Sequence, residues 1–160
     1  MRVGLVAIGR MKQGPERELV ARYLDRAIAS GKALGLTGFA VSELNESRAS
    51  SAASRKTEEA KAIGAQLPAG GLVIALDERG KTLGSDDFAK RIARWRDDGK
   101  SALSFVIGGA DGLDPSFVKA ADLTLSFSPL TWPHQLVRIM LAEQLYRATT
   151  ILSGHPYHRE

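Results

Sequence analysis

Short, largely apolar runs alternate along the chain with longer stretches whose apolar residues recur at helical spacing. The predicted strands are 3–8, 39–44, 72–76, 103–107 and 123–127, and the predicted helices are 15–28, 52–67, 86–96 and 135–151. Strands that are apolar throughout are typical of a sheet buried on both faces, and strands that alternate with helices pair in parallel. The pattern therefore predicts an α/β fold, a parallel sheet covered by helices on both faces, and a length of 160 residues fits one domain, 1–160.

Three loops leave the carboxyl ends of the predicted strands, at 77–81, 108–112 and 128–133. In open sheets of this kind, ligands bind beyond the carboxyl ends of the strands. We therefore expect the functional site where these loops meet.

The loop at 108–112 contains three glycines, Gly108, Gly109 and Gly112, directly after a predicted strand. Glycine lets a backbone approach a ligand closely and adopts positive φ without strain. The spacing matches neither GxGxxG nor GxxxxGK[ST], so the common nucleotide-binding fingerprints are absent. A ligand-binding wall and a tight turn before a helix start at Asp114-Pro115 both remain open.

The segment 126–133 is a long connection that contains two prolines and Trp132. Its backbone N–H and C=O groups can pair with a small polar ligand such as the edge of an adenine. The alternative interpretation is an ordered loop that caps the last helix.

The last helix and the terminus after it are rich in groups that stack, donate and titrate. Glu143 and Arg147 have the spacing of an i,i+4 pair, which is also typical of a weak surface salt bridge. In the terminal segment 154–160, Tyr and Arg side chains can stack on a base and grip phosphate, whereas the alternative is a terminus that merely docks on the fold. His155 and His158 have no third ligand nearby, so we expect no metal.

Composition narrows the possible chemistry. A net charge of +4 and a pI of about 9.6 favour a polyanionic partner such as nucleic acid, although mild basicity also occurs without one. The absence of cysteine excludes disulfides, thiolate metal sites and a cysteine nucleophile. The pattern predicts no membrane span and no signal peptide, and we expect a cytoplasmic protein.

Four motifs in order carry a resemblance to a known family: 107–113 (IGGADGL), 130–138 (LTWPHQLVR), 143–148 (EQLYRA) and 155–160 (HPYHRE). Together with the opening 3–9 and the third-strand exit at 76–81, they resemble the large-subunit ribosomal RNA pseudouridine N3-methyltransferases of the SPOUT superfamily. The similarity covers the whole length. Two departures are mild: Ala110-Asp111 replaces a Pro-Glu pair of some relatives, and Pro129 lies in the loop before the last helix.

The resemblance implies a C-terminal trefoil knot built from about 72–151, a feature that pattern alone does not predict. It implies that the cofactor is S-adenosyl-L-methionine and that the partners are a second copy of the chain, in a homodimer, and 23S rRNA within the ribosome. The family's cofactor site falls on eight residues: Leu76, Gly108, Phe127, Ser128, Pro129, Leu130, Thr131 and Trp132. These residues lie on the three loops chosen above on topological grounds.

The expected reaction is methyl transfer to N3 of a pseudouridine, an in-line displacement that depends on positioning and needs no covalent cysteine. We expect Tyr157, His158 and Arg159 to hold the base, with His158 as a candidate proton acceptor. Arg138 and Arg147 are expected to contact phosphate or to stabilise an enolate-like base. The alternative is a non-catalytic ribosome- or RNA-binding protein with the same fold, and the missing fingerprint disfavours a nucleotide-dependent oxidoreductase.

Overall fold

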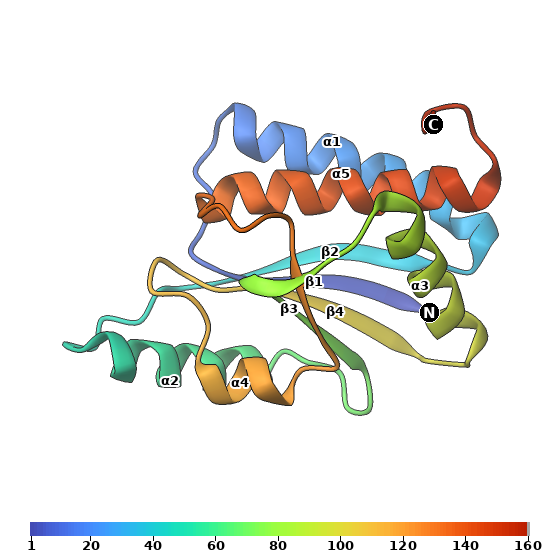
Figure 1. Ribbon diagram of the computed structural model, residues 1–160. Coiled ribbons are helices and arrows are strands. Elements are labelled where there is room, and N and C mark those ends of the chain that lie inside the picture. Colours follow the sequence, from blue (N-terminus) through green and yellow to red (C-terminus); the bar gives the residue numbers. More distant parts are fainter. Residues whose placement is uncertain (160) are drawn as a thin grey trace.

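Five parallel strands form one sheet in the order β2-β1-β4-β3-β5. The structure is a computed structural model that describes residues 1–159 (Figure 1). The strands are β1 (Arg2–Ile8), β2 (Thr37–Leu44), β3 (Leu72–Thr82), β4 (Ala102–Ile107) and β5 (Leu123–Ser126). All five predicted strands are confirmed, and so is their parallel pairing.

Helices cover both faces of this sheet (Figure 1). One face carries α1 (Pro15–Gly31), α3 (Ser85–Asp97) and α5 (His134–Ser153); the other carries α2 (Ala52–Gly64) and α4 (Pro115–Ala120). A short 3-10 turn, η1 (Lys32–Leu34), follows α1. Leu5 and Phe105 belong to the larger apolar core, whereas Val6 and Val106 belong to a smaller core on the other face. This alternation along β1 and β4 confirms a sheet buried on both sides.

Strand β3 differs from its prediction because it extends beyond Leu76 to Thr82. Leu125 of β5 pairs with both Leu76 and Lys81, so the intervening residues leave the ladder and then return to it. Gly80 makes this return possible, since a Cβ atom there would lie 2.7 Å from the carbonyl carbon of Leu125. The expected loop at 77–81 is therefore an excursion within a strand.

Two further differences concern helices. Helix α2 ends at Gly64 rather than at the predicted residue 67. Helix α4 was not among the predicted helices, although the pair Asp114-Pro115 signals its start: the Asp114 side chain accepts from the backbone N–H groups of Ser116 and Phe117. The trefoil knot stays a prediction. Within residues 1–159, every helix is too short or too polar to cross a membrane.

Candidate functional site

A cavity of about 730 Å³ lies at the carboxyl ends of β4 and β5, beside the segment of β3 that leaves the ladder after Leu76. All three predicted loops contribute to its wall, and His134 and Val137 of α5 close one side. Of the eight residues expected to bind the cofactor, seven line this cavity: Leu76, Gly108, Phe127, Ser128, Leu130, Thr131 and Trp132. Pro129 belongs to the same loop but is not part of the lining. The volume falls within the range of small-molecule sites.

The glycine loop packs so tightly that it excludes side chains at two positions. A Cβ atom on Gly108 would lie 2.8 Å from the carbonyl carbon of Gly112 and 2.9 Å from the nitrogen of Leu113. One on Gly109 would lie 2.9 Å from Cγ2 of Ile8. Gly112 has a φ of 79°, and its N–H donates to the Gly109 carbonyl at 3.0 Å. The loop is therefore both a tight turn and a wall of the cavity, so the two interpretations of the sequence are compatible.

The loop before α5 is braced by its own side chains. The Ser128 hydroxyl accepts from Nε1 of Trp132 at 2.9 Å and from the N–H of Leu130 at 3.0 Å. The Thr131 hydroxyl donates to Oε2 of Glu78 at 3.0 Å, which links this loop to the β3 excursion. Leu130 is nevertheless 66% exposed and Trp132 40% exposed. The loop thus holds its backbone in place while it leaves apolar surface uncovered.

Tyr157 docks the terminal segment onto the second half of α5. Its hydroxyl donates to Oε1 of Glu143 at 3.1 Å, and its ring centroid lies 4.7 Å from that of Tyr146. The guanidinium carbon of Arg147 lies 4.9 Å from the centroid of the Tyr157 ring. Burial, aided by the charge of Glu143, raises the pKa of Tyr157 to about 12. The phenol is therefore neutral at physiological pH and acts as a hydrogen-bond donor.

Arg147 connects Glu143 to His158. Its Nε donates to Oε1 of Glu143 at 2.9 Å, a contact that raises the pKa of Arg147, and its Nη1 lies 3.2 Å from Nδ1 of His158. A guanidinium only donates, so Nδ1 of His158 is the acceptor in this contact. Nε2 lies 3.5 Å from a carboxylate oxygen of Asp86 at the start of α3. Both ring nitrogens of His158 are thus engaged, whereas Arg159 is exposed.

Arg138 is placed differently from the other predicted catalytic residues. Its side chain is 1% exposed, and its Nη1 donates to Oε1 of Glu43 at 2.8 Å. Its Nη2 donates to the carbonyls of Ile8 at 2.7 Å and Gly9 at 2.5 Å, and burial lowers its pKa despite the Glu43 charge. In this chain the guanidinium joins α5 to the ends of β1 and β2. It has no exposed face to offer a phosphate in this arrangement.

The two predicted sets of residues lie at opposite ends of α5. His134 lies in the cavity wall, whereas Arg147, thirteen residues later, holds the terminal segment; this separation corresponds to about 20 Å along the helix axis. The structure therefore brings the cofactor residues together, and the terminal residues together, but not the two sets. Sequence reasoning missed Asp86 and Glu43 as partners because neither stands in a motif or near its partner in sequence. Among residues 1–159, no cluster of three or more His, Asp or Glu side chains is arranged to hold a metal ion.

Comparisons with known proteins bear on this arrangement. A family described as "Predicted SPOUT methyltransferase" matches residues 1–158. The chain is 60% identical to a "Ribosomal RNA large subunit methyltransferase H" of Allorhizobium ampelinum and 59% identical to one of Rhizobium etli, each over 99% of both chains. A solved structure titled "Probable Methyltransferase" from Bordetella pertussis matches with a TM-score of 0.50 at 15% identity, over 92% of this chain and 95% of that one, and supports the fold alone. The chain belongs to the SPOUT methyltransferase family.

Proposed function

We propose that the protein transfers a methyl group from S-adenosyl-L-methionine to N3 of a pseudouridine in 23S rRNA, on the assembled ribosome. The observation that carries this proposal is the cavity at the carboxyl ends of β4 and β5, walled by the three loops that bear the family motifs. The names of the full-length relatives support ribosomal RNA as the substrate. We further propose that residues 1–160 form one methyltransferase domain that works in the cytoplasm, where ribosomes are.

The cavity is the proposed donor site. The backbone of the loop that includes Phe127, Ser128, Pro129 and Thr131 would pair with the adenine edge, and Gly108 would let the opposite wall approach the nucleoside. Bound S-adenosyl-L-methionine supplies an electrophilic methyl group on a sulfonium that loses its charge as the methyl leaves. Apolar wall residues such as Leu76 and Trp132 exclude water, which favours that loss of charge.

The terminal segment is the proposed acceptor site. Tyr157 and Arg159 would stack on the base and grip phosphate, and Arg147 would neutralise negative charge on the base as N3 loses its proton. His158 is the proposed acceptor of that proton. Because Nδ1 of His158 already accepts from Arg147, this role requires Arg147 to transfer its hydrogen bond to the RNA when the substrate binds.

A homodimer would bring the two sites together. One chain's terminal segment lies at the far end of α5 from its own cavity, so the proposed active site combines one chain's cavity with its partner's terminal segment. Three apolar side chains of the cavity loop and the first turn of α5 are exposed, namely Leu130, Trp132 and Leu136. A stretch of exposed apolar surface of this kind is typical of an interface. A second chain that packs on it would cover these residues.

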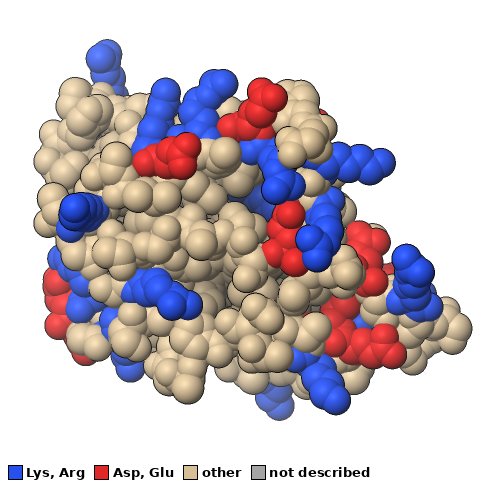
Figure 2. All heavy atoms as spheres, turned by 180° about the vertical axis from the view of Figure 1, so that it is seen from behind, with Lys and Arg blue, Asp and Glu red and all other residues tan. Residues whose placement is uncertain are grey.

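Recognition of the ribosome would depend on shape as well as charge. On the face shown in Figure 2, Lys and Arg side chains are scattered and stand beside Asp and Glu side chains around a largely uncharged centre, so positive charge is not gathered in one patch on this face. A net charge of +4 supplies general attraction to RNA.

Mass mapping of ribosomal RNA tests this proposal. Ribosomes from a strain that lacks the gene should lack one methyl group on a pseudouridine of 23S rRNA, and purified protein with S-adenosyl-L-methionine should restore it. Intact ribosomes should be better substrates than free 23S rRNA. If the protein binds ribosomes but neither binds the donor nor restores the methyl group, the non-catalytic alternative is correct.

A further inference from the structure

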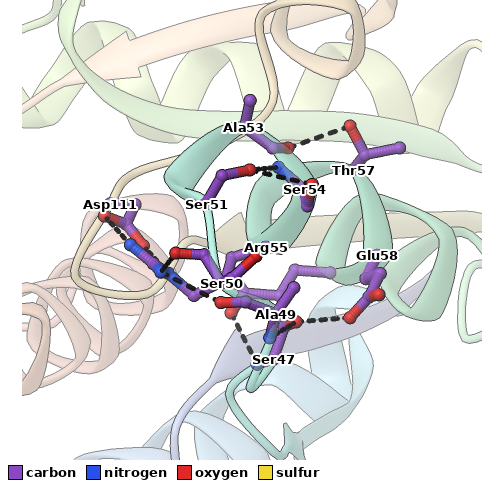
Figure 3. Close-up of polar contacts among 11 residues, drawn as sticks. Ser47, Ala49, Ser50, Ser51, Ala53, Ser54, Arg55, Thr57, Glu58 and Asp111 are labelled. Carbon is purple, nitrogen blue, oxygen red and sulfur yellow. Dashed lines mark hydrogen bonds and ion pairs between the residues drawn. The ribbon is translucent and has the colours of Figure 1, made fainter.

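A single arginine outside the cavity links its glycine wall to another part of the chain. Arg55, in the first turn of α2, donates from Nε to Oδ2 of Asp111 at 2.6 Å and from Nη2 to Oδ1 at 3.1 Å (Figure 3). Asp111 lines the cavity and stands between the glycines of the 108–112 loop. This two-point contact fixes the direction of the carboxylate as well as its distance.

The same guanidinium also holds the segment that follows β2. Its Nη1 donates to the carbonyls of Ala49 at 3.1 Å and Ser50 at 3.4 Å (Figure 3). Arg55 therefore spans the loops that leave the carboxyl ends of two strands, β2 and β4. Its position is determined from one side by backbone carbonyls and from the other by Asp111.

Hydrogen bonds hold the start of helix α2 against the segment that follows β2, so the backbone that carries Arg55 is ordered. Ser51 caps the helix by accepting from the N–H of Ser54 at 3.1 Å. The N–H of Ser47 donates to Oε1 of the buried Glu59 at 2.9 Å, and its hydroxyl donates to Glu58 (Figure 3). Because these contacts order the helix start, little further ordering is needed for Arg55 to reach Asp111.

Backbone packing and the hydrogen bond from Gly112 to Gly109 shape the glycine loop from within, and Asp111 is its side-chain anchor to the rest of the chain. Of its five residues, three are glycines and one is Ala110, so Asp111 is the loop residue whose side chain can form polar contacts. The hydrogen bond from Arg55 lowers the pKa of Asp111, so the carboxylate stays charged and able to bind the guanidinium down to acidic pH. Both side chains are 29% exposed, so the pair adds little to global stability and its effect should be local.

We propose that Arg55 is a positioning residue for the methyl-donor site, where it holds the 108–112 loop in its ligand-binding shape through the two-point contact with Asp111. This inference rests on the proposed function, since it takes the cavity to be the donor site. Arg55 itself lies outside the cavity lining, so it acts through Asp111 rather than on the donor. Loss of the contact should weaken donor binding and leave the chemical step unchanged once the donor is saturating.

The test compares five variants of the full-length protein by calorimetry with S-adenosyl-L-methionine and by methylation of ribosomes at saturating donor. Arg55→Gln and Asp111→Asn should each raise the Kd for the donor roughly tenfold, and the double variant should do no more than either alone, because both break one contact. Arg55→Lys should recover only part of the affinity, since an ammonium cannot make the two-point contact. Arg94→Gln, which breaks an exposed pair on α3, is the matched control and should change nothing.

Hydrogen exchange of the loop without any ligand distinguishes a failure of the positioning role of Arg55 from a failure of the proposed function. Amides of 109–113 should exchange several-fold faster in Arg55→Gln than in the wild type, with the melting temperature of the two proteins nearly equal. An unchanged Kd in both single variants, or a fall in kcat at saturating donor with no change in Kd, overturns the positioning role. A wild-type protein that binds no donor while Arg55→Gln still loosens the loop contradicts the proposed function instead.

Discussion

At its first turn, helix α5 contributes His134 and Val137 to a cavity whose wall is largely loop backbone, whereas near its other end Glu143 and Arg147 hold a docked terminus through side chains. The first region depends on glycines and close approach, and the second on charge and hydrogen bonding. The first is suited to enclose a nucleoside, and the second to hold a polar base and phosphate. About 20 Å of helix separates His134 from Arg147, so one chain carries both proposed parts of the site but does not join them.

Removal of the terminal segment should have the largest effect, because it should lower turnover without changing donor binding at the cavity. Deletion of residues 157–160 removes the groups proposed to hold the base and should lower turnover on ribosomes roughly hundredfold or more, because positioning of the acceptor is lost. The Kd for S-adenosyl-L-methionine should stay within a few-fold, since the cavity lies at the opposite end of α5. A radiolabelled methyl-transfer assay and calorimetry measure the two quantities. Turnover at the full-length rate would mean that the terminus is only docked.

Replacement of Arg138 tests how much its buried contacts, which join α5 to β1 and β2, stabilise the fold. Arg138→Ala leaves Glu43 without its buried partner and frees the carbonyls of Ile8 and Gly9, so it should lower the free energy of unfolding by about 3–5 kcal/mol. Urea unfolding measures this change. Arg94→Ala, on an exposed i,i+4 pair, should change the same quantity by less than about 0.5 kcal/mol. An equal loss of unfolding free energy in the two variants would show that the buried contacts of Arg138 stabilise the fold no more than the exposed pair does.

Tyr157 should have a smaller effect on the pH dependence of stability, and this effect should appear only above pH 10. Its folded pKa of about 12 lies above the ordinary value of 10.0, so the folded protein retains the phenol proton more strongly than the unfolded chain does. The stabilisation is complete below pH 10 and is lost as the pH rises from 10 towards 12. Stability of the wild type should therefore fall more steeply across this window than that of Tyr157→Phe in chemical unfolding at each pH. Parallel curves would mean that the phenol is not buried against Glu143.

The elements of the fold could be predicted because hydrophobic spacing determines them locally. Strands that are apolar throughout, such as 103–107, predict a parallel sheet, and parallel pairing places the 108–112 and 128–133 loops at one edge of it before any contact is known. The β3 excursion could not be predicted, because it depends on Leu125 pairing with both Leu76 and Lys81. Helix α4 is too short for its periodicity to be distinctive.

Sequence motifs could identify candidate site residues, but they could not predict contacts between residues that lie far apart in the sequence. Arg138 was expected to contact phosphate or the base because it stands in a family motif, yet Glu43, 95 residues away, holds it inside. The terminal residues were selected by their chemistry, but only the fold shows that Arg147 and Asp86 engage both nitrogens of His158. The fold also shows what the sequence does not for Gly108: a side chain there would lie against the backbone of Gly112 and Leu113.

The central claim is that one chain's cavity works with its partner's terminal segment, and mixed dimers test it most directly. Chains that lack 157–160 are mixed with chains that carry Gly108→Val, each inactive alone, after unfolding and joint refolding. Random pairing makes half of the dimers mixed, each with one intact composite site, so activity on ribosomes should return to about a quarter of the wild-type value. If the mixture stays as inactive as its components while wild-type chains treated in the same way recover, the site is not shared between chains.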